Sequence, residues 1–420
     1  MMFRSQQNYR TFLTVLMTYA LDSLGYSIAF PVLAPLLLDM QLAFFASSTQ
    51  EAARTTVLGF LFAVFGIAQF FGASIAGALA DHYGRYKTFL GTIGLSVLGY
   101  AVMAVSIYEQ DLGWLFVGRA LTGLCSGNVA LAQSATADLT ETENRSRAFG
   151  ILLGVGGLGF VVGPWIGGKL ANPDWLSGSG AFIFAAVAAL INFFMVLFFF
   201  VETYKPKAKH IETALLRTFK DIRLVFQQKV LSTILMTYLL FAIGWGFFLI
   251  FSPTFLVQRF SLGPDQIGDI FAYMAVTWFF VSMFLNKELS GKFSMRSLII
   301  AGSLIAFVGV AFFLYPKTLW PYWIIIPVAL VGGALTWVNL SALLSIRTPE
   351  HMQGRALGAS GSMWSIGQIL APLIAGPLAG WNMYLPLLVG SITIFFSFVY
   401  FLFRYRDEKS GTGGTRSTSF

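Results

Sequence analysis

The sequence predicts an all-α membrane protein that crosses the bilayer twelve times. Of its 420 residues, 56% are hydrophobic and 11% are charged, with a mean hydropathy of +0.73. Soluble domains contain fewer apolar and more charged residues. The apolar residues form runs that match a membrane helix of about 20 residues. A transmembrane β-barrel would show alternating segments of about 10 residues, and no such segments are visible.

The apolar runs fall into two sets of six. They lie near residues 12–38, 55–79, 88–108, 112–137, 146–170, 180–201, 231–257, 266–286, 297–315, 321–346, 354–379 and 382–403. We therefore expect two pseudo-symmetric six-helix bundles, with a linker between them and a tail after them. The predicted division is 1–201 for the first bundle, 202–230 for the linker, 231–404 for the second bundle and 405–420 for a disordered tail.

An internal repeat supports this division. Arg147-Ala-Phe-Gly150 is echoed by Arg355-Ala-Leu-Gly358, and at the same offset Gly163-Pro164 corresponds to Ala371-Pro372. Parallel six-span halves with a site between them are one known plan of a transporter.

Basic residues orient the spans. Most Lys and Arg residues lie at span ends on the side shared by both termini, which predicts cytoplasmic termini. This topology also accounts for the net charge of +8 without a nucleic-acid partner. The first apolar run is longer than a signal-peptide core, so we expect an uncleaved first span. The single cysteine, Cys125, excludes a disulfide within the chain.

The linker contains one predicted helix. In His210–Gln227, apolar residues recur at helical spacing among basic residues, as in a helix that lies on an anionic membrane surface. A simple tether with solvated charges fits the same pattern.

Two ionisable residues lie inside apolar runs, where lipid would exclude a charge. Asp22 and Arg119 fall about ten and about seven residues into the first and fourth runs, at depths of about 15 and about 10 Å. Charges at such depth face a cavity or a partner. We expect Asp22 to carry a proton, because a carboxyl group can load and release one as its surroundings change. Arg119 could answer this charge, since an arginine at this depth can pair with a carboxylate, hold an anionic substrate or perturb a proton site. A structural buried acid and an arginine clamped to carbonyl groups are the alternatives.

A charged string links the second and third spans on the side of the termini. It runs from Gly77 to Lys87. Gly77 would allow close helix approach, Asp81 could cap the next helix or accept from Arg85, and Gly84 permits a tight turn. We expect a cytoplasmic gate whose charges pair when that side closes and separate when it opens. An ordinary basic loop is the alternative.

The loop between the fourth and fifth spans carries charges that could join this gate, namely Asp138, Arg145 and Arg147. Solvated loop charges would explain them as well. In the fifth span, Gly159, Gly163 and Gly167 share one face next to Pro164. This face predicts close helix packing, and it could form a sliding seam between the halves.

Polar and aromatic side chains within the spans are candidates for lining a substrate cavity, because polar groups avoid lipid. The candidates are Tyr26, Asn128, Gln368, Trp245, Trp278, Asn339 and Trp364. Each of them could instead make a helix–helix contact. Asp269, at the start of the eighth span, is expected to be solvated.

Several of these strings resemble the motifs of one transporter family. The Gly77–Lys87 string is similar to the signature of the major facilitator superfamily, and Asp22–Pro35 is similar to the first span of its tetracycline/proton and multidrug/proton antiporters. Gly118–Gly123 resembles the fourth-span arginine motif, and the glycines of Gly150–Gly168 resemble the fifth-span antiporter motif. The resemblance implies a rocker-switch carrier, with proton-driven export and with Arg119 in proton coupling.

The resemblance departs from the tetracycline antiporters in the second half. Those proteins carry further polar or charged residues in spans 8 and 9, whereas this chain is mostly apolar at 272–278 and 301–306. The sequence therefore does not identify tetracycline as the substrate.

These observations predict a proton-coupled antiporter that exports a small amphipathic compound from a bacterial cell across the inner membrane. The expected partners are the compound, protons and the lipid bilayer, and the protein is expected to act as a monomer. We expect no enzyme activity, no metal and no cofactor, because the sequence has no phosphate loop and its three histidines lie far apart. A proton-linked importer or uniporter, and a receptor or scaffold that does not transport, are the alternatives.

Overall fold

The computed structural model describes residues 6–39, 42, 44–46, 48–172, 176–204, 222–349 and 352–406, without the side chains of residues 142 and 146. The regular structure in these ranges is helical. The helices of the first half are α1 (Gln6–Ser27), α2 (Ala29–Leu38), α3 (Glu51–Tyr83), α4 (Arg85–Tyr108), α5 (Leu112–Cys125), α6 (Asn128–Leu139), η1 (Thr142–Asn144), α7 (Arg145–Leu170), η2 (Leu176–Gly178) and α8 (Gly180–Phe199). Those of the second half are α10 (Lys229–Phe260), α11 (Pro264–Phe280), η3 (Val281–Leu285), α12 (Asn286–Ser290), α13 (Met295–Phe312), α14 (Tyr322–Arg347), α15 (Gln353–Trp381) and α16 (Leu385–Arg404).

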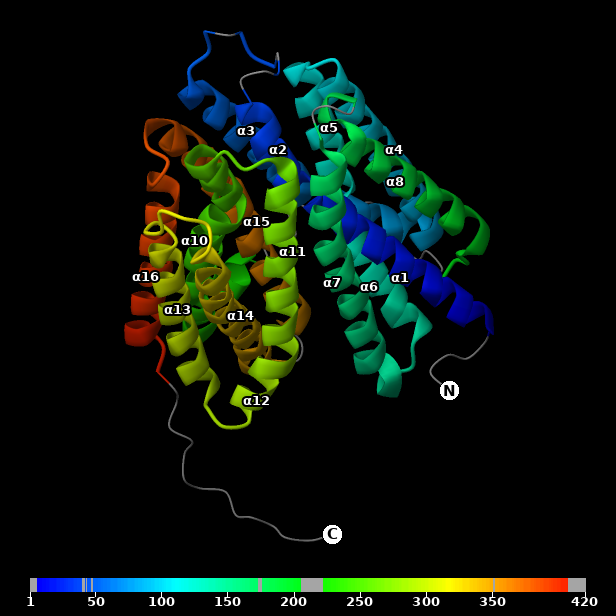
Figure 1. Cartoon of the computed structure of the whole chain (residues 1–420). Helices are drawn as coiled ribbons and strands as arrows, with labels where there is room; N and C mark the ends of the chain where they lie inside the picture. Colours follow the sequence, from blue (N-terminus) through cyan, green and yellow to red (C-terminus); the bar gives the residue numbers. More distant parts are fainter. Residues whose placement is uncertain are drawn as a thin grey trace.

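Within the described ranges, twelve helical segments are long and apolar enough to cross a membrane, which confirms the predicted fold class. Three of these spans are interrupted. The first changes from α1 to α2 at Ile28, shortly before Pro31, which has no backbone N–H for a helical hydrogen bond. The fourth breaks at Ser126 and Gly127, and the eighth passes through the π-helical turn η3. The helices α1–α8 gather on one side of the molecule and α10–α16 on the other (Figure 1).

The two halves meet toward one end of the spans. We call the end at which α1 begins and α16 ends the terminal face, and the other end the opposite face. The helices that join the halves are α3 with α15, α7 with α11, and α2 with α10 and α11. Gly59 of α3 lies against Gly376 of α15, and Gly168 of α7 lies against Gly268 of α11. These small residues let the helix backbones approach closely near the opposite face.

Polar contacts reinforce this junction of the halves near the opposite face, which we call the seal. Lys169 forms ion pairs across it with Asp265 and, at 3.1 Å, with Asp269. Gln258 donates a hydrogen bond to the Glu51 carboxylate at 2.9 Å. Asp269, expected to be solvated, is half-exposed, and its carboxylate in addition pairs with a lysine of the other half.

The halves are open toward the terminal face. Four glycines in the terminal-face half of the spans, two on α7 and two on α15, have open space where a side chain would begin. Apart from their own helix, no atom lies within 4 Å of the position that a Cβ would take at Gly150, Gly154, Gly354 or Gly358. In the described ranges, α1 and α6, which form the terminal-face parts of the first and fourth spans, pack mainly on helices of their own half. The structure therefore combines a closed opposite face with an open terminal face.

Two predicted boundaries fall partly outside the described ranges. The expected linker helix is described only from residue 222 onward, and residues 222–226 are helical. Most of the expected tail lies beyond residue 406. The predicted division places Tyr405 in the disordered tail. In the structure it is instead 3% exposed and stacks on Phe401 at 4.9 Å between ring centres. The folded part thus extends past α16 because this ring packs against it.

Candidate transport site and gate

Asp22 lies on α1 beside the break in the fourth span. Its carboxylate accepts a hydrogen bond from the Asn128 side-chain amide at 3.1 Å, and Asn128 accepts one from the Thr92 hydroxyl at 2.5 Å. Asn128 is the first residue of α6, and its side chain is fully buried. The break at Ser126–Gly127 thus brings the Asn128 amide to α1. Asp22 itself is partly exposed, so a row of three polar side chains runs from an accessible carboxyl group into α4.

Arg119 is 4% exposed and lies among aromatic rings of α3. Its guanidinium lies 4.4 Å from the Phe65 ring centre and 5.3 Å from that of Phe62, and its Nε donates to the Leu61 carbonyl at 3.4 Å. Stacking of a guanidinium on aromatic faces is favourable, more so in a desolvated site. These contacts are the ones expected of an arginine clamped to the backbone.

Asp22 and Arg119 do not form an ion pair with each other in this structure. Asp22 binds Asn128, and Arg119 binds Leu61 and the rings of α3. Tyr100 of α4 is within electrostatic reach of both charges, and its hydroxyl packs against Gly25, one turn along α1 from Asp22. A tyrosine therefore stands near both groups, which the sequence pattern did not predict.

A small cavity of about 10 Å³ adjoins Arg119 at the meeting point of the halves. The Gln368 side chain of α15 lies in its wall and is 4% exposed, and its Nε2 has no hydrogen-bond partner in the described part of the chain. Tyr26 lies in the same wall, with its ring 5.3 Å from Phe65 and 6.0 Å from Phe160. The structure thus brings Tyr26 and Gln368 to Arg119, and the cavity is about the size of one water molecule.

The four remaining cavity candidates belong to the second half and are not among the residues that line this cavity. Trp245 is buried and packs on Trp278 at 5.6 Å between ring centres, whereas Trp364 packs on Trp337 at 4.6 Å. Asn339 is buried, and its amide donates to the Asn286 side chain at 2.7 Å and to the Leu335 carbonyl at 2.8 Å. Asn339 therefore makes a helix–helix contact, which joins α14 to α12.

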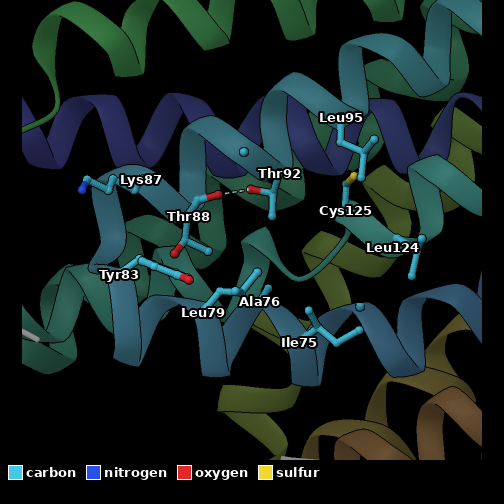
Figure 2. A pocket seen from close by; sticks show the side chains of 12 residues that line it. Ile75, Ala76, Leu79, Tyr83, Lys87, Thr88, Thr92, Leu95, Leu124 and Cys125 are labelled. Atoms are coloured by element: carbon cyan, nitrogen blue, oxygen red, sulfur yellow. Dashed lines mark hydrogen bonds between the residues drawn. The ribbon is translucent and has the colours of Figure 1, made fainter. Parts of the chain in front are cut away.

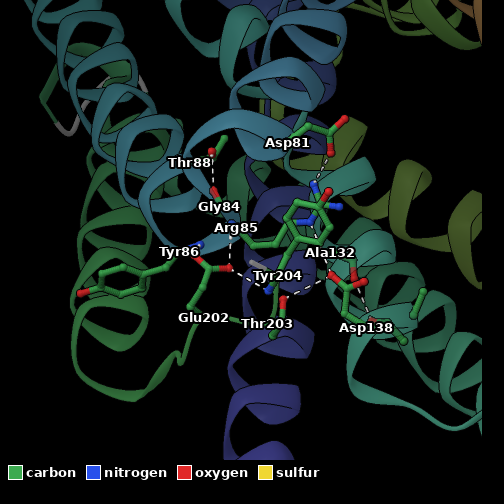
Figure 3. A network of polar contacts seen from close by, with 12 residues as sticks. Asp81, Gly84, Arg85, Tyr86, Thr88, Ala132, Asp138, Glu202, Thr203 and Tyr204 are labelled. Atoms are coloured by element: carbon green, nitrogen blue, oxygen red, sulfur yellow. Dashed lines mark hydrogen bonds and ion pairs between the residues drawn. The ribbon is translucent and has the colours of Figure 1, made fainter. Parts of the chain in front are cut away.

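The charged string forms a network at the terminal face, which we call the gate cluster (Figure 3). Arg85 pairs with Asp81 at 3.2 Å and with Asp138 at 3.5 Å, and its guanidinium lies 4.8 Å from the Tyr204 ring centre. Gly84 has a φ of +91°, which a residue with a Cβ rarely adopts. The turn that it makes sets Arg85 at the start of α4.

Glu202 completes the gate cluster, although its place in the sequence does not indicate a gate residue. Its carboxylate accepts hydrogen bonds from the backbone N–H groups of Arg85 at 3.0 Å and Tyr86 at 3.1 Å, so it caps α4 in place of Asp81 (Figure 3). A carboxylate at a helix N-terminus is favoured by the helix dipole and by the free N–H groups there. Glu202 lies more than 110 residues from its partners, so local spacing gave no signal of the contact.

The gate cluster differs from the expected gate in one respect. Its ion pairs are intact although the halves are open at this face, because Asp81, Arg85 and Asp138 all belong to the first half. The expectation that these charges separate on opening is therefore wrong.

The remaining gate candidates contribute less to the cluster. Arg145 donates to the Ala137 carbonyl at 3.2 Å, while Arg147 and Lys87 are exposed. A Cβ added at Gly77 would have no atom within 4 Å, and the close helix approach occurs at Gly72, which packs on the Leu124 backbone. The prediction of close packing at Gly77 is thus wrong in this conformation.

The glycine face of the fifth span packs within its own half. Gly159, Gly163 and Gly167 lie against Ala20, Leu24 and Ile28 along α1 and into the break after it. This face therefore brings the Asp22 helix close to α7 and is not the seam between the halves. The seam uses the next residues around the helix, since the Pro164 carbonyl contacts Gly268 and Gly168 lies beside it.

In the described ranges, twelve membrane-length helices form two groups that are sealed at one end and open at the other, which defines a polytopic membrane transporter. The profile of the Major Facilitator Superfamily matches residues 15–372, and the chain belongs to this family.

The chain is similar to efflux proteins along most of its length. It is 29% identical over 368 residues to the class H tetracycline resistance protein of Pasteurella multocida, covering 87% of this chain and 88% of that protein. It is 25% identical over 349 residues to Multidrug resistance protein 2 of Bacillus subtilis, covering 79% and 82%. Among solved structures, a D-xylose–proton symporter superposes with a TM-score of 0.75 over 94% of this chain and 98% of that chain, at 15% identity. Because its sequence identity is low, the symporter shows a likeness in fold alone.

Proposed function

We propose that this transporter is a proton-coupled antiporter that exports a small amphipathic compound by alternating access. In this proposal the terminal face is cytoplasmic, and the protein works as a monomer in a bacterial inner membrane. The proton gradient supplies the energy, and no cofactor takes part. The observation that carries the proposal is a partly exposed carboxyl group, Asp22, within the span region of a carrier that is open at the terminal face and closed at the opposite face.

Asp22 is suited to exchange a proton because its surroundings can change with the conformation. In the open-terminal state it is partly exposed and accepts a hydrogen bond from Asn128. A hydrogen bond from a neutral donor stabilises the ionised carboxylate, whereas an apolar setting favours the protonated acid. Closure of the terminal face would remove water from Asp22 and so favour the protonated form. Proton loading would then be tied to the direction in which the carrier faces.

Arg119 takes a different role in this proposal. It is buried beside the Gln368 amide, whose nitrogen has no hydrogen-bond partner among the described residues, at the inner end of the seal where the two halves meet. Opening of the opposite face would part these two donors. Arg119 therefore belongs to the seal and to the electrostatic field around Asp22, rather than to a direct ion pair.

The class of substrate is supported by the wall chemistry and by the relatives. Tyr26, Phe30, Phe62 and Phe65 supply aromatic surface beside the two donors of Arg119 and Gln368. The cavity is now about the size of one water molecule, so a compound would reach this wall only after the halves part there. An aromatic wall with a few polar groups suits a compound that is mostly apolar and carries hydrogen-bond acceptors. The printed names of the relatives, tetracycline resistance and multidrug resistance, make tetracycline and an amphipathic dye the first compounds to test.

Transport in proteoliposomes tests the proposal. The purified protein is reconstituted with a pH-sensitive dye in the lumen, a pH gradient is imposed, and tetracycline or ethidium is added. Antiport predicts that compound and protons move in opposite directions, and movement in the same direction would indicate a symporter. Asp22→Asn should abolish the gradient-driven movement, Asp22→Glu should retain part of it, and Glu109→Gln, in an exposed loop, should behave as the unmodified protein. Normal gradient-driven transport by Asp22→Asn would refute the assignment of Asp22.

A further inference from the structure

A groove on the flank of the first half is separate from the site at Arg119. It lies between α3 and α4, with the end of α5 as its floor, and encloses about 320 Å³ (Figure 2). Neither α4 nor α5 is among the helices that join the halves, and Ile75, Leu124 and Gly91 in its wall are exposed. The groove therefore opens on the side of the bundle, where the membrane lies.

We infer that this groove binds one acyl chain of an anionic phospholipid, with the lipid phosphate at Lys87. The distribution of polar and apolar residues along the groove supports this occupant. Its length is lined by the apolar side chains of Ile75, Leu79, Leu95 and Leu124. Such a wall suits a hydrocarbon chain.

The polar end of the groove lies at the terminal face. Lys87 is the third residue of α4, and with Tyr83 it forms the end of the groove that is nearest this face (Figure 2). Lys87 has no ion-pair partner in the part of the chain that the structure describes. The nearest acid along α3, Asp81, is paired with Arg85. A lysine and a tyrosine at the level of the head groups form a site for a phosphate, because basic residues near a membrane surface attract anionic lipids and tyrosine favours the interface.

The size of the groove limits the occupant. Pockets for drug-sized compounds range from about 300 to about 1,000 Å³, and this groove lies at the low end of that range. It also runs inward only to Leu95, about ten residues or about 15 Å along α4 from Arg85. One acyl chain of a lipid in the leaflet at the terminal face fits both the volume and the length of the groove.

The α4 wall of the groove connects it to Asp22. Thr92 lines the groove, and its hydroxyl binds Asn128, which in turn binds Asp22. A chain in the groove would cover this hydroxyl and shield the polar row from the flank. The lipid site itself does not depend on proton coupling, so its test requires no transport.

Native mass spectrometry of the full-length protein in detergent tests the inference, with dioleoylphosphatidylglycerol and dioleoylphosphatidylcholine as probes at equal concentration. The unmodified protein should retain phosphatidylglycerol in preference. Lys87→Gln should weaken this retention about fivefold. Gly91→Leu should also weaken it, because residue 91 lines the groove and no atom lies within 4 Å of its Cβ position, so a side chain can begin there and occupy the groove. The matched controls, Lys287→Gln and Gly354→Leu, change an exposed lysine and an open glycine outside the groove and should have no effect.

Any other outcome would overturn the proposed lipid site. Equal retention of both lipids that Gly91→Leu lowers would mean a chain site without recognition of the phosphate. Loss with Lys87→Gln but not with Gly91→Leu would mean surface attraction without a groove site. A dimer that Gly91→Leu dissociates would make the groove an interface between copies. Retention that neither variant changes would place the lipid elsewhere.

Discussion

Substitution of Gly59 by alanine should shift the carrier away from the conformation described above. A methyl group at residue 59 would meet the Pro372 carbonyl oxygen and would lie 2.9 Å from the Gly376 α-carbon. Both are backbone atoms of α15, so they cannot move aside as a flexible side chain could. Overpacking of this kind costs about 1–3 kcal/mol. That cost falls on the state with a closed opposite face, so its population relative to the reverse state should drop about 5–150-fold.

The matched control is Gly91→Ala. Both glycines lie within helices, so both substitutions gain about 1 kcal/mol in helix propensity, and this gain is the same in both conformations. At Gly91 the methyl group enters open space on a helix that takes no part in the seal. The difference between the two variants thus isolates the contact at the seal.

Distances between spin labels report the shift. In a Cys125→Ser background, one pair replaces Trp114 and Tyr315 near the opposite face, and the other replaces Tyr83 and Leu357 near the terminal face. All four side chains are exposed, at 57%, 80%, 50% and 49%. Gly59→Ala should lengthen the first distance and shorten the second. Unchanged distance distributions in a folded Gly59→Ala protein, or an equal change in Gly91→Ala, would refute the reasoning.

Three further predictions concern polar contacts. Lys169→Gln should favour opening of the opposite face by at most about 1 kcal/mol, because its ion pairs are half-exposed; the effect should vanish at high salt, and the same spin-label distances measure it. Glu202→Gln should lower thermal stability by about 1–2 kcal/mol through loss of the charged cap on α4, whereas Glu109→Gln should not; equal melting temperatures would contradict the capping role. Arg54→Met should cost about 1–3 kcal/mol in thermal unfolding, because the 1%-exposed guanidinium donates to the Leu37 and Asp39 carbonyls, and an unchanged melting curve would exclude that role.

The spans could be predicted from the sequence because the bilayer imposes a simple local requirement. A helix must stay apolar for about 20 residues, and a turn such as the one at Gly84 must interrupt it. Asp22, Asn128 and Arg119 could be identified for the same reason, since each is a polar group at a depth that lipid excludes.

The pairing of these groups could not be predicted, because it depends on packing between distant segments. Asp22 and Asn128 are 106 residues apart, and they meet because the fourth span breaks immediately before Asn128. The pairing of Lys169 with Asp269, 100 residues away, depends on the closed conformation of the opposite face. The sequence encodes both conformations of a carrier at once, so it cannot indicate which contacts one of them makes.

The position of Glu202 has a mechanical consequence for the whole molecule. The chain leaves α8 at Phe199, and Glu202, Thr203 and Tyr204 then all contact the gate cluster before the chain continues toward the second half. The connection between the halves is thus held at the start of α4 and near the end of α6, beyond the end of α8. Force that a moving second half exerts through this connection would reach the residues that hold Arg85 before it reaches the sixth span.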